Sequence, residues 1–253
     1  TVVGGWTGTL ANNGEAVELQ DAAGRTVDRL EYATEGDWAE RATGDPYPGQ
    51  PEWWRGWKWT TGADAGGRSF ELVNSRLPGR YGQNWSSSRT PGGTPDGANS
   101  VAASDVAPLI LEVRHTPAIP RSTDEVWVTA RIVDEEAANL VVHLRHRQDS
   151  SASFDSTLML DDGQQGDGGP GDGRYGARLP AAPDRTIVEF YVEAQDASGK
   201  TRTWPGPAAD LEAQVVNALY QVDDAVYEGS QAVYRLVIPT NDWANWTYLM
   251  DSV

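Results

Sequence analysis

One segment of the chain combines carboxylates with glycines in a way that suits metal binding. Residues 161–173 read DDGQQGDGGPGDG, and the four carboxylates belong to Asp161, Asp162, Asp167 and Asp172. Calcium takes roughly six to eight oxygen ligands without a strict geometry, so carboxylates on a flexible backbone can bind it. The spacing matches neither an EF-hand loop nor the nonapeptide repeat of calcium-binding β-helices. These four aspartates are therefore a candidate site for Ca²⁺, the only cofactor that the sequence suggests.

The same residue types also have a purely structural explanation. Glycine supplies the positive φ angles that a long hairpin loop needs, and aspartate side chains accept hydrogen bonds from nearby backbone amides. The sequence leaves both interpretations open: a calcium loop, or a loop whose aspartates stabilise its own backbone.

A second segment concentrates aromatic side chains between prolines. Its members are Tyr47, Trp53, Trp54, Trp57 and Trp59. Residues two apart on a strand point to the same face, so Trp57 and Trp59 would form a platform for sugar rings if they share a strand. Exposed aromatic patches usually mark a binding partner, which would be another protein domain or a surface polysaccharide. The alternative is that these rings cover the core of a small domain or a seam between domains.

Recognisable catalytic motifs are absent from the sequence. It contains no Gly-x-Ser-x-Gly elbow, no His-Glu-x-x-His and no phosphate-binding or dinucleotide-binding glycine loop. The acidic runs at 134–136 and 223–224 fall at predicted turns, where solvation explains them better than a glycosidase carboxylate pair does. We therefore expect that this chain is not an enzyme.

Composition restricts the partners and the compartment. A net charge of −17 argues against nucleic acid, which requires clustered lysine and arginine. The absence of cysteine excludes disulfides and thiolate zinc sites. No apolar run is long enough for a transmembrane helix. The first residues have neither an initiator methionine nor the features of a signal peptide, so we expect a processed or trimmed fragment.

Apolar and polar residues alternate along short segments bounded by turn residues, which predicts β-strands. Residues 15–19 and 26–32 predict a hairpin around a tight turn at 21–25. The expected core residues of this hairpin are Val17, Leu19, Val27, Leu30 and Tyr32. A further short strand is expected at 69–73, and a Ser/Thr/Gly/Pro-rich linker at 86–99.

A second series of strands begins after Pro108. The expected strands span 109–114, 126–133, 140–147, 154–160, 175–179 and 187–194, followed by a turn at 196–200 and a short last strand. This spacing fits an antiparallel sandwich. Further along, a strand is expected at 234–238 and the start of a helix at 239–243.

Parts of the chain resemble known families. The first part resembles a lamin-tail domain, a small Ig-like β module, through GTLANNGE at 8–15, VELQD at 17–21, GRTVD at 24–28, Tyr32, Trp38, GRSFEL at 67–72, NW at 84–85 and TPGGTP at 90–95. The opening strands usual in that family are missing here.

The second part is similar to a bacterial Ig or fibronectin-type-III-like domain, through VTARIVD at 128–134, the acidic loop and VEFYVEAQD at 188–196. The last part is similar to the start of a CotH-type (spore-coat protein H) kinase-like domain, through LYQVDD at 219–224 and VYRLV at 233–237.

The expected fold class is therefore all-β, with two Ig-like β-sandwich domains in tandem and a partial α+β segment at the C-terminal end. The predicted boundaries are 1–104, 105–208 and 209–253. The resemblances imply an extracellular or cell-surface bacterial protein in which this region is structural or adhesive. The alternative function is the accessory region of an extracellular CotH-like protein kinase, whose catalytic residues would lie beyond Val253.

Overall fold

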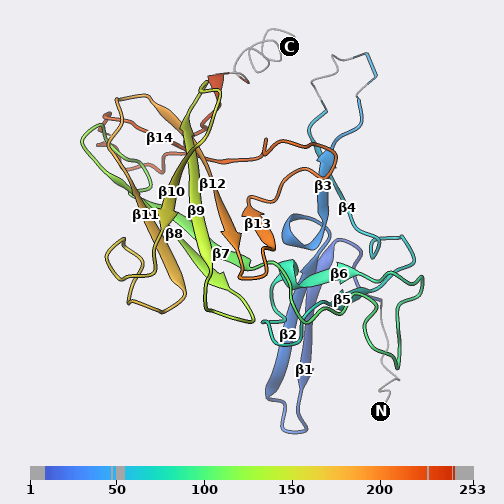
Figure 1. The fold of residues 1–253 in the computed structure, drawn as a ribbon. Coiled ribbons are helices and arrows are strands. Elements are labelled where there is room, and N and C mark those ends of the chain that lie inside the picture. Colours follow the sequence, from blue (N-terminus) through green and yellow to red (C-terminus); the bar gives the residue numbers. More distant parts are fainter. Residues whose placement is uncertain (1–8, 47, 50–54, 227, 241, 243–253) are drawn as a thin grey trace. The chain divides into compact units, whose positions relative to one another are not determined.

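The computed structural model describes residues 9–46, 48–49, 55–226, 228–240 and 242 (Figure 1). Nearly all regular structure in these ranges is antiparallel β-sheet, which confirms the all-β prediction. The chain divides into two compact units. The first comprises Thr1–Leu109 with Gly206–Val215, and the second comprises Ile110–Pro205 with Val216–Val253. No helix among the described residues is long and apolar enough to cross a membrane.

The first unit begins with the predicted hairpin. Strand β1 (Gly14–Gln20) pairs antiparallel with β2 (Thr26–Ala33), with Val17 opposite Leu30. The Asp21 side chain accepts hydrogen bonds from the backbone amides of Ala23 and Arg25, and this side-chain contact fixes the tight turn. The hairpin therefore follows from local sequence, as predicted.

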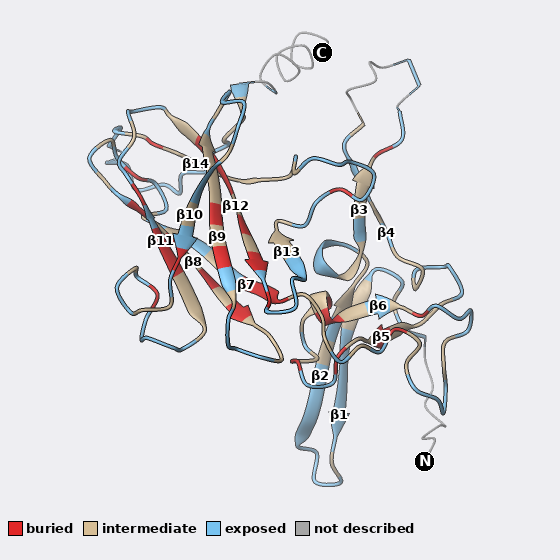
Figure 2. Cartoon of the chain, in the orientation of Figure 1, coloured by how far each residue is buried: buried red, intermediate tan, exposed pale blue. Residues whose placement is uncertain are grey.

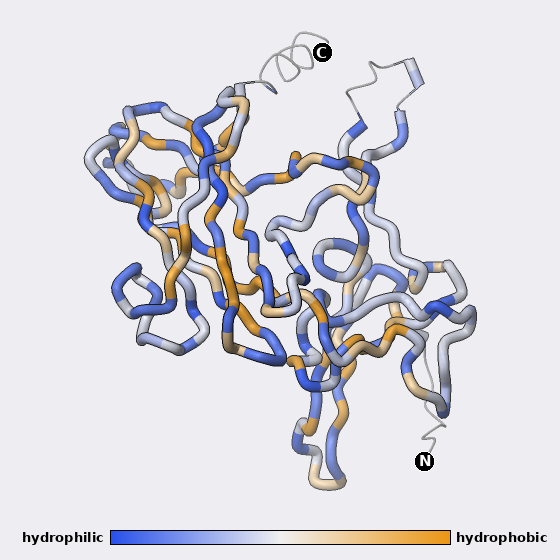
Figure 3. The backbone as a smooth tube through the Cα atoms, in the orientation of Figure 1, coloured by the Kyte–Doolittle hydropathy of each residue, from blue (hydrophilic) through white to orange (hydrophobic). Residues whose placement is uncertain are grey.

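The predicted burial of the hairpin is wrong. Val17, Leu19 and Val27 are 44%, 62% and 63% exposed, and only Leu30 and Tyr32 are half-buried (Figure 2). Hydrophobic and hydrophilic residues are interspersed along both strands (Figure 3). Val17 and Leu19 share one face with Leu30, but burial also requires a second layer, and among the described residues little covers this face. Val27 lies at the bulge between the pairs Leu19–Asp28 and Gln20–Thr26, so it is not part of that face.

Two further small sheets follow in the first unit. Strand β3 (Glu40–Thr43) pairs with β4 (Trp57–Thr60), and β5 (Phe70–Leu72) pairs with β6 (Trp85–Ser87). Two 3₁₀ turns, η1 (Gly36–Trp38) and η2 (Gly82–Asn84), precede β3 and β6. The predicted strand at 69–73 is confirmed as β5, whereas residues 85–87 of the predicted linker are strand β6.

Aromatic rings and buried polar contacts hold the first unit together. The Trp38 ring centroid lies 5.4 Å from that of Phe70 and 5.8 Å from that of Trp85. Glu71 is 5% exposed, and its carboxylate accepts hydrogen bonds from the Thr94 hydroxyl and from the Ser100 amide and hydroxyl. These bonds, with that from Thr94 the largest cause, lower the pKa of Glu71 despite its burial. They attach the loop at 88–101 to β5.

The second unit contains two sheets on either side of one core. One sheet has the order β10 (Asp155–Met159), β9 (Val141–Gln148), β12 (Ile187–Gln195) and β13 (Thr201–Trp204). Strand β14 (Ala218–Gln221) also belongs to this sheet and pairs with the first half of β12. The other sheet has the order β11 (Arg174–Leu179), β8 (Val126–Val133) and β7 (Leu109–Thr116). All the strands expected between 109 and 204 are present.

The core of the second unit follows the predicted alternation. Along β8, Val126, Val128, Ala130 and Ile132 are buried while their neighbours are half-buried (Figure 2). Hydrophobic residues concentrate on these strands, whereas the connecting loops are mainly hydrophilic (Figure 3). The buried core residues contributed by both sheets and by the residue after β14 include Ile110, Val142, Leu144, Met159, Leu179, Val188, Phe190, Val192, Tyr220 and Val222.

The C-terminal part differs from expectation in two respects. Residues 219–221, which carry part of the resemblance to a CotH-type domain, lie in β14 of the second unit. The strand expected at 234–238 is wrong, because these residues are not in a strand. Of the helix start expected at 239–243, Thr240 and Asp242 are helical, whereas Asn241 and Trp243 lie outside the described residues. The predicted domain boundaries stay a prediction, although the division of the chain groups Gly206–Val215 with the first unit.

Candidate functional site

The acidic loop follows β10, and Asp167 lies at its centre. Its side chain is fully buried. The Asp167 Oδ2 atom accepts hydrogen bonds from the amides of Asp162 and Gly163, each at 2.9 Å, and Oδ1 accepts one from Gln165 at 2.7 Å. One carboxylate thus organises the first half of the loop.

Asp161 and Asp172 organise the second half. Asp161 accepts hydrogen bonds from the amides of Gly171, Asp172 and Gly173 at 2.8–3.2 Å. Asp172 accepts them from Gly169 and Arg174, both at 2.9 Å, and the bond from Gly169 is the largest cause of its lowered pKa. Gly168 has a φ of +100°, a backbone conformation that residues with a side chain rarely adopt, so this position favours glycine.

These contacts are what the structural interpretation of the loop predicts. The remaining candidate, Asp162, accepts a hydrogen bond from the Gln164 amide at 3.0 Å. Among the described residues there is no group of three or more histidine, cysteine, aspartate or glutamate side chains placed to hold a metal ion. The calcium hypothesis stays a prediction that a titration can decide.

We expect the second unit to melt at the same temperature with Ca²⁺ as with a chelator, because backbone amides already occupy the carboxylate oxygens that calcium would need. Thermal unfolding in Ca²⁺ and in EDTA, together with a calorimetric titration, measures this. A calcium-dependent rise in melting temperature would contradict the expectation. If Asp161→Asn and Asp172→Asn then removed that rise and the control Asp155→Asn on β10 did not, the loop would be a calcium site.

The aromatic segment is described in part. Tyr47, Trp53 and Trp54 lie outside the described residues. Trp57 and Trp59 both lie on β4, so they share a strand and point to the same side of it, as the platform hypothesis requires. Trp57 is 47% exposed and Trp59 is half-buried.

Arg41 lies over the rings of both tryptophans. Its strand, β3, pairs with β4 so that Arg41 is opposite Trp59 and Thr43 is opposite Trp57. The guanidinium carbon is 4.5 Å from the Trp59 ring centroid and 6.0 Å from that of Trp57, within the range of cation–π attraction. We call these three side chains, Arg41, Trp57 and Trp59, the Arg–Trp cluster.

A distant segment of the chain fixes the backbone of β3. Ala208 forms a parallel bridge with Arg41, and the amide of Ala209 donates to the Arg41 carbonyl at 2.7 Å. Arg41 Nη1 donates to the Gly206 carbonyl at 2.8 Å. The Thr43 amide donates to the Asp210 carboxylate at 3.1 Å, which is the largest cause of the lowered pKa of Asp210. Arg41 is therefore held in place on both edges of its strand.

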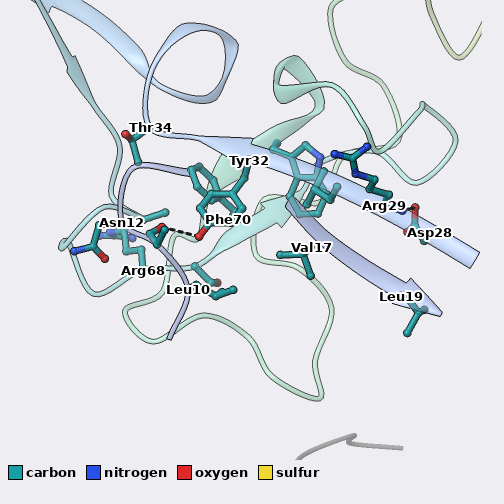
Figure 4. A pocket seen from close by; sticks show the side chains of 15 residues that line it. Leu10, Asn12, Val17, Leu19, Asp28, Arg29, Tyr32, Thr34, Arg68 and Phe70 are labelled. Carbon is teal, nitrogen blue, oxygen red and sulfur yellow. Dashed lines mark hydrogen bonds between the residues drawn. The ribbon is translucent and has the colours of Figure 1, made fainter. Parts of the chain in front are cut away.

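Two grooves in the first unit were not predicted. The apolar face of the β1–β2 hairpin forms one wall of a groove of about 470 Å³, which is also lined by Leu10, Phe70 and Arg68 (Figure 4). In Figure 4 the Tyr32 hydroxyl and the side chains of Val17 and Leu19 lie along this face. The only sequence signal for this groove was the pattern of apolar residues in the hairpin, and that pattern led us to predict that these residues lie in a core.

The second groove, of about 610 Å³, is lined by side chains from η1, β3, β4 and β6. Its lining combines tryptophans, hydroxyls and charges of both signs. The run Ser86-Ser87-Ser88 was interpreted as linker composition, so the sequence contained the residue types but not the pairing that brings them together.

Comparisons with known proteins assign no family to this chain: no protein-family model matches it, and no curated protein matches it significantly.

Proposed function

We propose that this chain is a non-catalytic structural and adhesive region of a bacterial secreted or cell-surface protein. In this proposal the two units are Ig-like β-sandwich domains that act as spacers and present binding surfaces to other protein domains or to surface polysaccharide. The observation that carries the adhesive part is the Arg–Trp cluster.

The cluster has the properties of a binding surface. A half-exposed tryptophan keeps apolar ring area in contact with water, and that area is released from water when a sugar ring or an apolar side chain covers it. The cation–π contacts and the hydrogen bond to Gly206 hold Arg41 in one geometry before any ligand binds. Such preorganisation lowers the entropy cost of binding.

The spacer part is supported by the second unit. Its core draws buried side chains from both sheets, and arginine–glutamate pairs connect β9 to β12 on the outer face, at 2.6 Å for Arg145–Glu193 and 2.9 Å for Arg147–Glu189. A rigid β-sandwich is suited to a spacer module, which holds the neighbouring domains of a protein at a distance from each other. The rival function, the accessory region of an extracellular CotH-like kinase, stays a prediction, and no described contact favours it.

Replacing Trp57 by alanine should weaken binding to the polysaccharide or protein that the cluster recognises by about thirtyfold, since truncating an aromatic anchor typically costs about 2 kcal/mol. The side chain is half-exposed, so the melting temperature should change little. Pull-down on insoluble polysaccharides, followed by a binding isotherm for the one retained, measures the effect.

The matched control is Trp127→Ala in the second unit, because Trp127 also lies beneath an arginine, with the Arg178 guanidinium carbon 5.7 Å from its ring centroid. Equal binding by the wild type and the Trp57→Ala variant would contradict the role of the Arg–Trp cluster in adhesion. Equal losses in both variants would show that the effect is not specific to the cluster.

A further inference from the structure

The polar groove of the first unit lies on the opposite face of the β3–β4 hairpin from the Arg–Trp cluster. Directly paired residues share a face of an antiparallel sheet, and adjacent residues alternate between faces. Arg41 and Trp59 are paired and belong to the cluster, whereas Glu40 and Thr60 are paired and line the groove. The two surfaces therefore use different side chains and can be tested separately.

Packing and hydrogen bonds hold the wall of the groove in place. Trp38 and Trp85 form this aromatic wall, and the Trp85 Nε1 atom donates to the Gly79 carbonyl at 2.6 Å. The Thr61 and Ser87 hydroxyls are hydrogen-bonded to each other at 2.9 Å. A Cβ at Gly62 would lie 2.6 Å from the Arg68 side chain, which shows how closely these segments approach.

The rim of the groove has unused hydrogen-bonding capacity. Glu40, Thr60, Ser86 and Arg89 are exposed and line the groove. Within the described part of the chain, their side-chain polar atoms make no hydrogen bond or ion pair. Arg68, by contrast, is already engaged, because its guanidinium donates to the carbonyls of Ser88 and Arg89. The Glu40 carboxylate, the Arg89 guanidinium and the Thr60 hydroxyl thus remain available to a ligand beside the aromatic wall.

We infer that this groove binds a neutral saccharide. A pocket of this size, with a few polar groups on an aromatic wall, is typical of a small-ligand site. A saccharide carries many hydroxyls, each of which can both donate and accept a hydrogen bond. They match a rim that combines the Glu40 carboxylate, the Arg89 guanidinium and the Thr60 hydroxyl.

Charge selects a neutral ligand over an anionic one. Two acids, Asp37 and Glu40, and two arginines, Arg68 and Arg89, line the groove, so its charges balance. The chain as a whole carries −17, and this field opposes the approach of an acidic polysaccharide or a phosphate. A neutral sugar meets no such barrier.

The inference deepens the adhesive part of the proposed function, on which it rests, but it places the ligand on other residues. The test is a calorimetric titration of the full chain with neutral hexasaccharides of glucose, mannose and N-acetylglucosamine, and with an oligogalacturonate as the acidic probe. At least one neutral hexasaccharide should bind. Glu40→Ala and Arg89→Ala should each weaken that binding about tenfold or more, as expected for hydrogen bonds to charged groups.

The control variant is Glu31→Ala, which removes an exposed carboxylate from β2 outside the groove. It should leave binding unchanged, and the groove variants should keep the wild-type melting temperature because their side chains are exposed. Absence of binding by every neutral hexasaccharide would overturn the inference. So would binding of the acidic probe alone.

The two proposals fail differently in the same experiment. Saccharide binding that Trp57→Ala removes and the groove variants leave intact would place the ligand on the Arg–Trp cluster, which would overturn the groove inference and support the proposed function. Loss in the groove variants with no effect of Trp57→Ala would support the groove and contradict the role of the cluster.

Discussion

Replacing Phe190 by alanine should lower the free energy of unfolding of the second unit by about 3–5 kcal/mol, the usual cost of removing a large side chain from a core. Phe190 is 2% exposed and lies on β12, which pairs with strands on both of its edges. Its ring centroid is 6.1 Å from that of His115 and 6.2 Å from that of Tyr220. A small unit of typical stability would lose a large part of its margin. Denaturant unfolding monitored by circular dichroism measures the loss.

Tyr191→Ala is the matched control for Phe190→Ala. Tyr191 is the next residue on β12, so it points to the other face, where its ring packs edge-on against Phe154 at 5.0 Å. A half-buried aromatic on the outer face should cost clearly less than one in the core. Losses of similar size in the two variants would contradict the assignment of the core to the face that contains Phe190.

Asn84→Asp should destabilise the first unit by about 3 kcal/mol or more. Asn84 is fully buried, and its Nδ2 atom donates to the carbonyls of Asn74, Leu77 and Pro78 at 2.9–3.4 Å. Its Oδ1 atom accepts from the Asn74 amide at 2.9 Å. The substitution replaces the donor with an oxygen facing three carbonyls and buries a charge without a partner, two of the costliest changes in a protein interior. Thermal unfolding of the full chain measures the shift.

The control for Asn84→Asp is Asn13→Asp, the same chemical change at an exposed position in the same unit. It should leave the melting temperature nearly unchanged. If both variants melted alike, the hydrogen bonds of Asn84 would not be what holds the turn at 74–84 in place, and the aromatic cluster alone would have to account for the stability of this unit.

Much of the fold could be predicted because its signals are local. The β1–β2 hairpin depends on alternation and on Asp21, whose side chain bonds to amides only two and four residues away. The strands of the second unit alternate in the same way, and their core follows from that pattern. The acidic loop also behaves locally, since its aspartates bond to amides within twelve residues.

Predictions failed where the outcome depends on a partner distant in sequence. The apolar face of the β1–β2 hairpin was predicted to be core, but alternation does not say whether a second layer exists to cover Leu19. The strand expected at 234–238 has suitable residues and yet pairs with no strand among those described. Strands β3 and β4 are short and separated by the segment from 44 to 56, so they have no periodic signal of their own.

The same distinction between local sequence and distant partners applies to the candidate sites. The sequence by itself determined which residue types are present: the four aspartates of the loop, and Trp57 and Trp59 two positions apart. Only the tertiary structure decided that Asp167 faces backbone amides, that Arg41 lies over the rings of both tryptophans, and that Glu40 and Ser86 line one groove. The physical reason is that residue type and strand periodicity are encoded locally, whereas the neighbours of a side chain depend on pairings between segments distant in sequence. The bridge between Arg41 and Ala208 and the hydrogen bond from Arg41 to Gly206, 165 residues away, are examples.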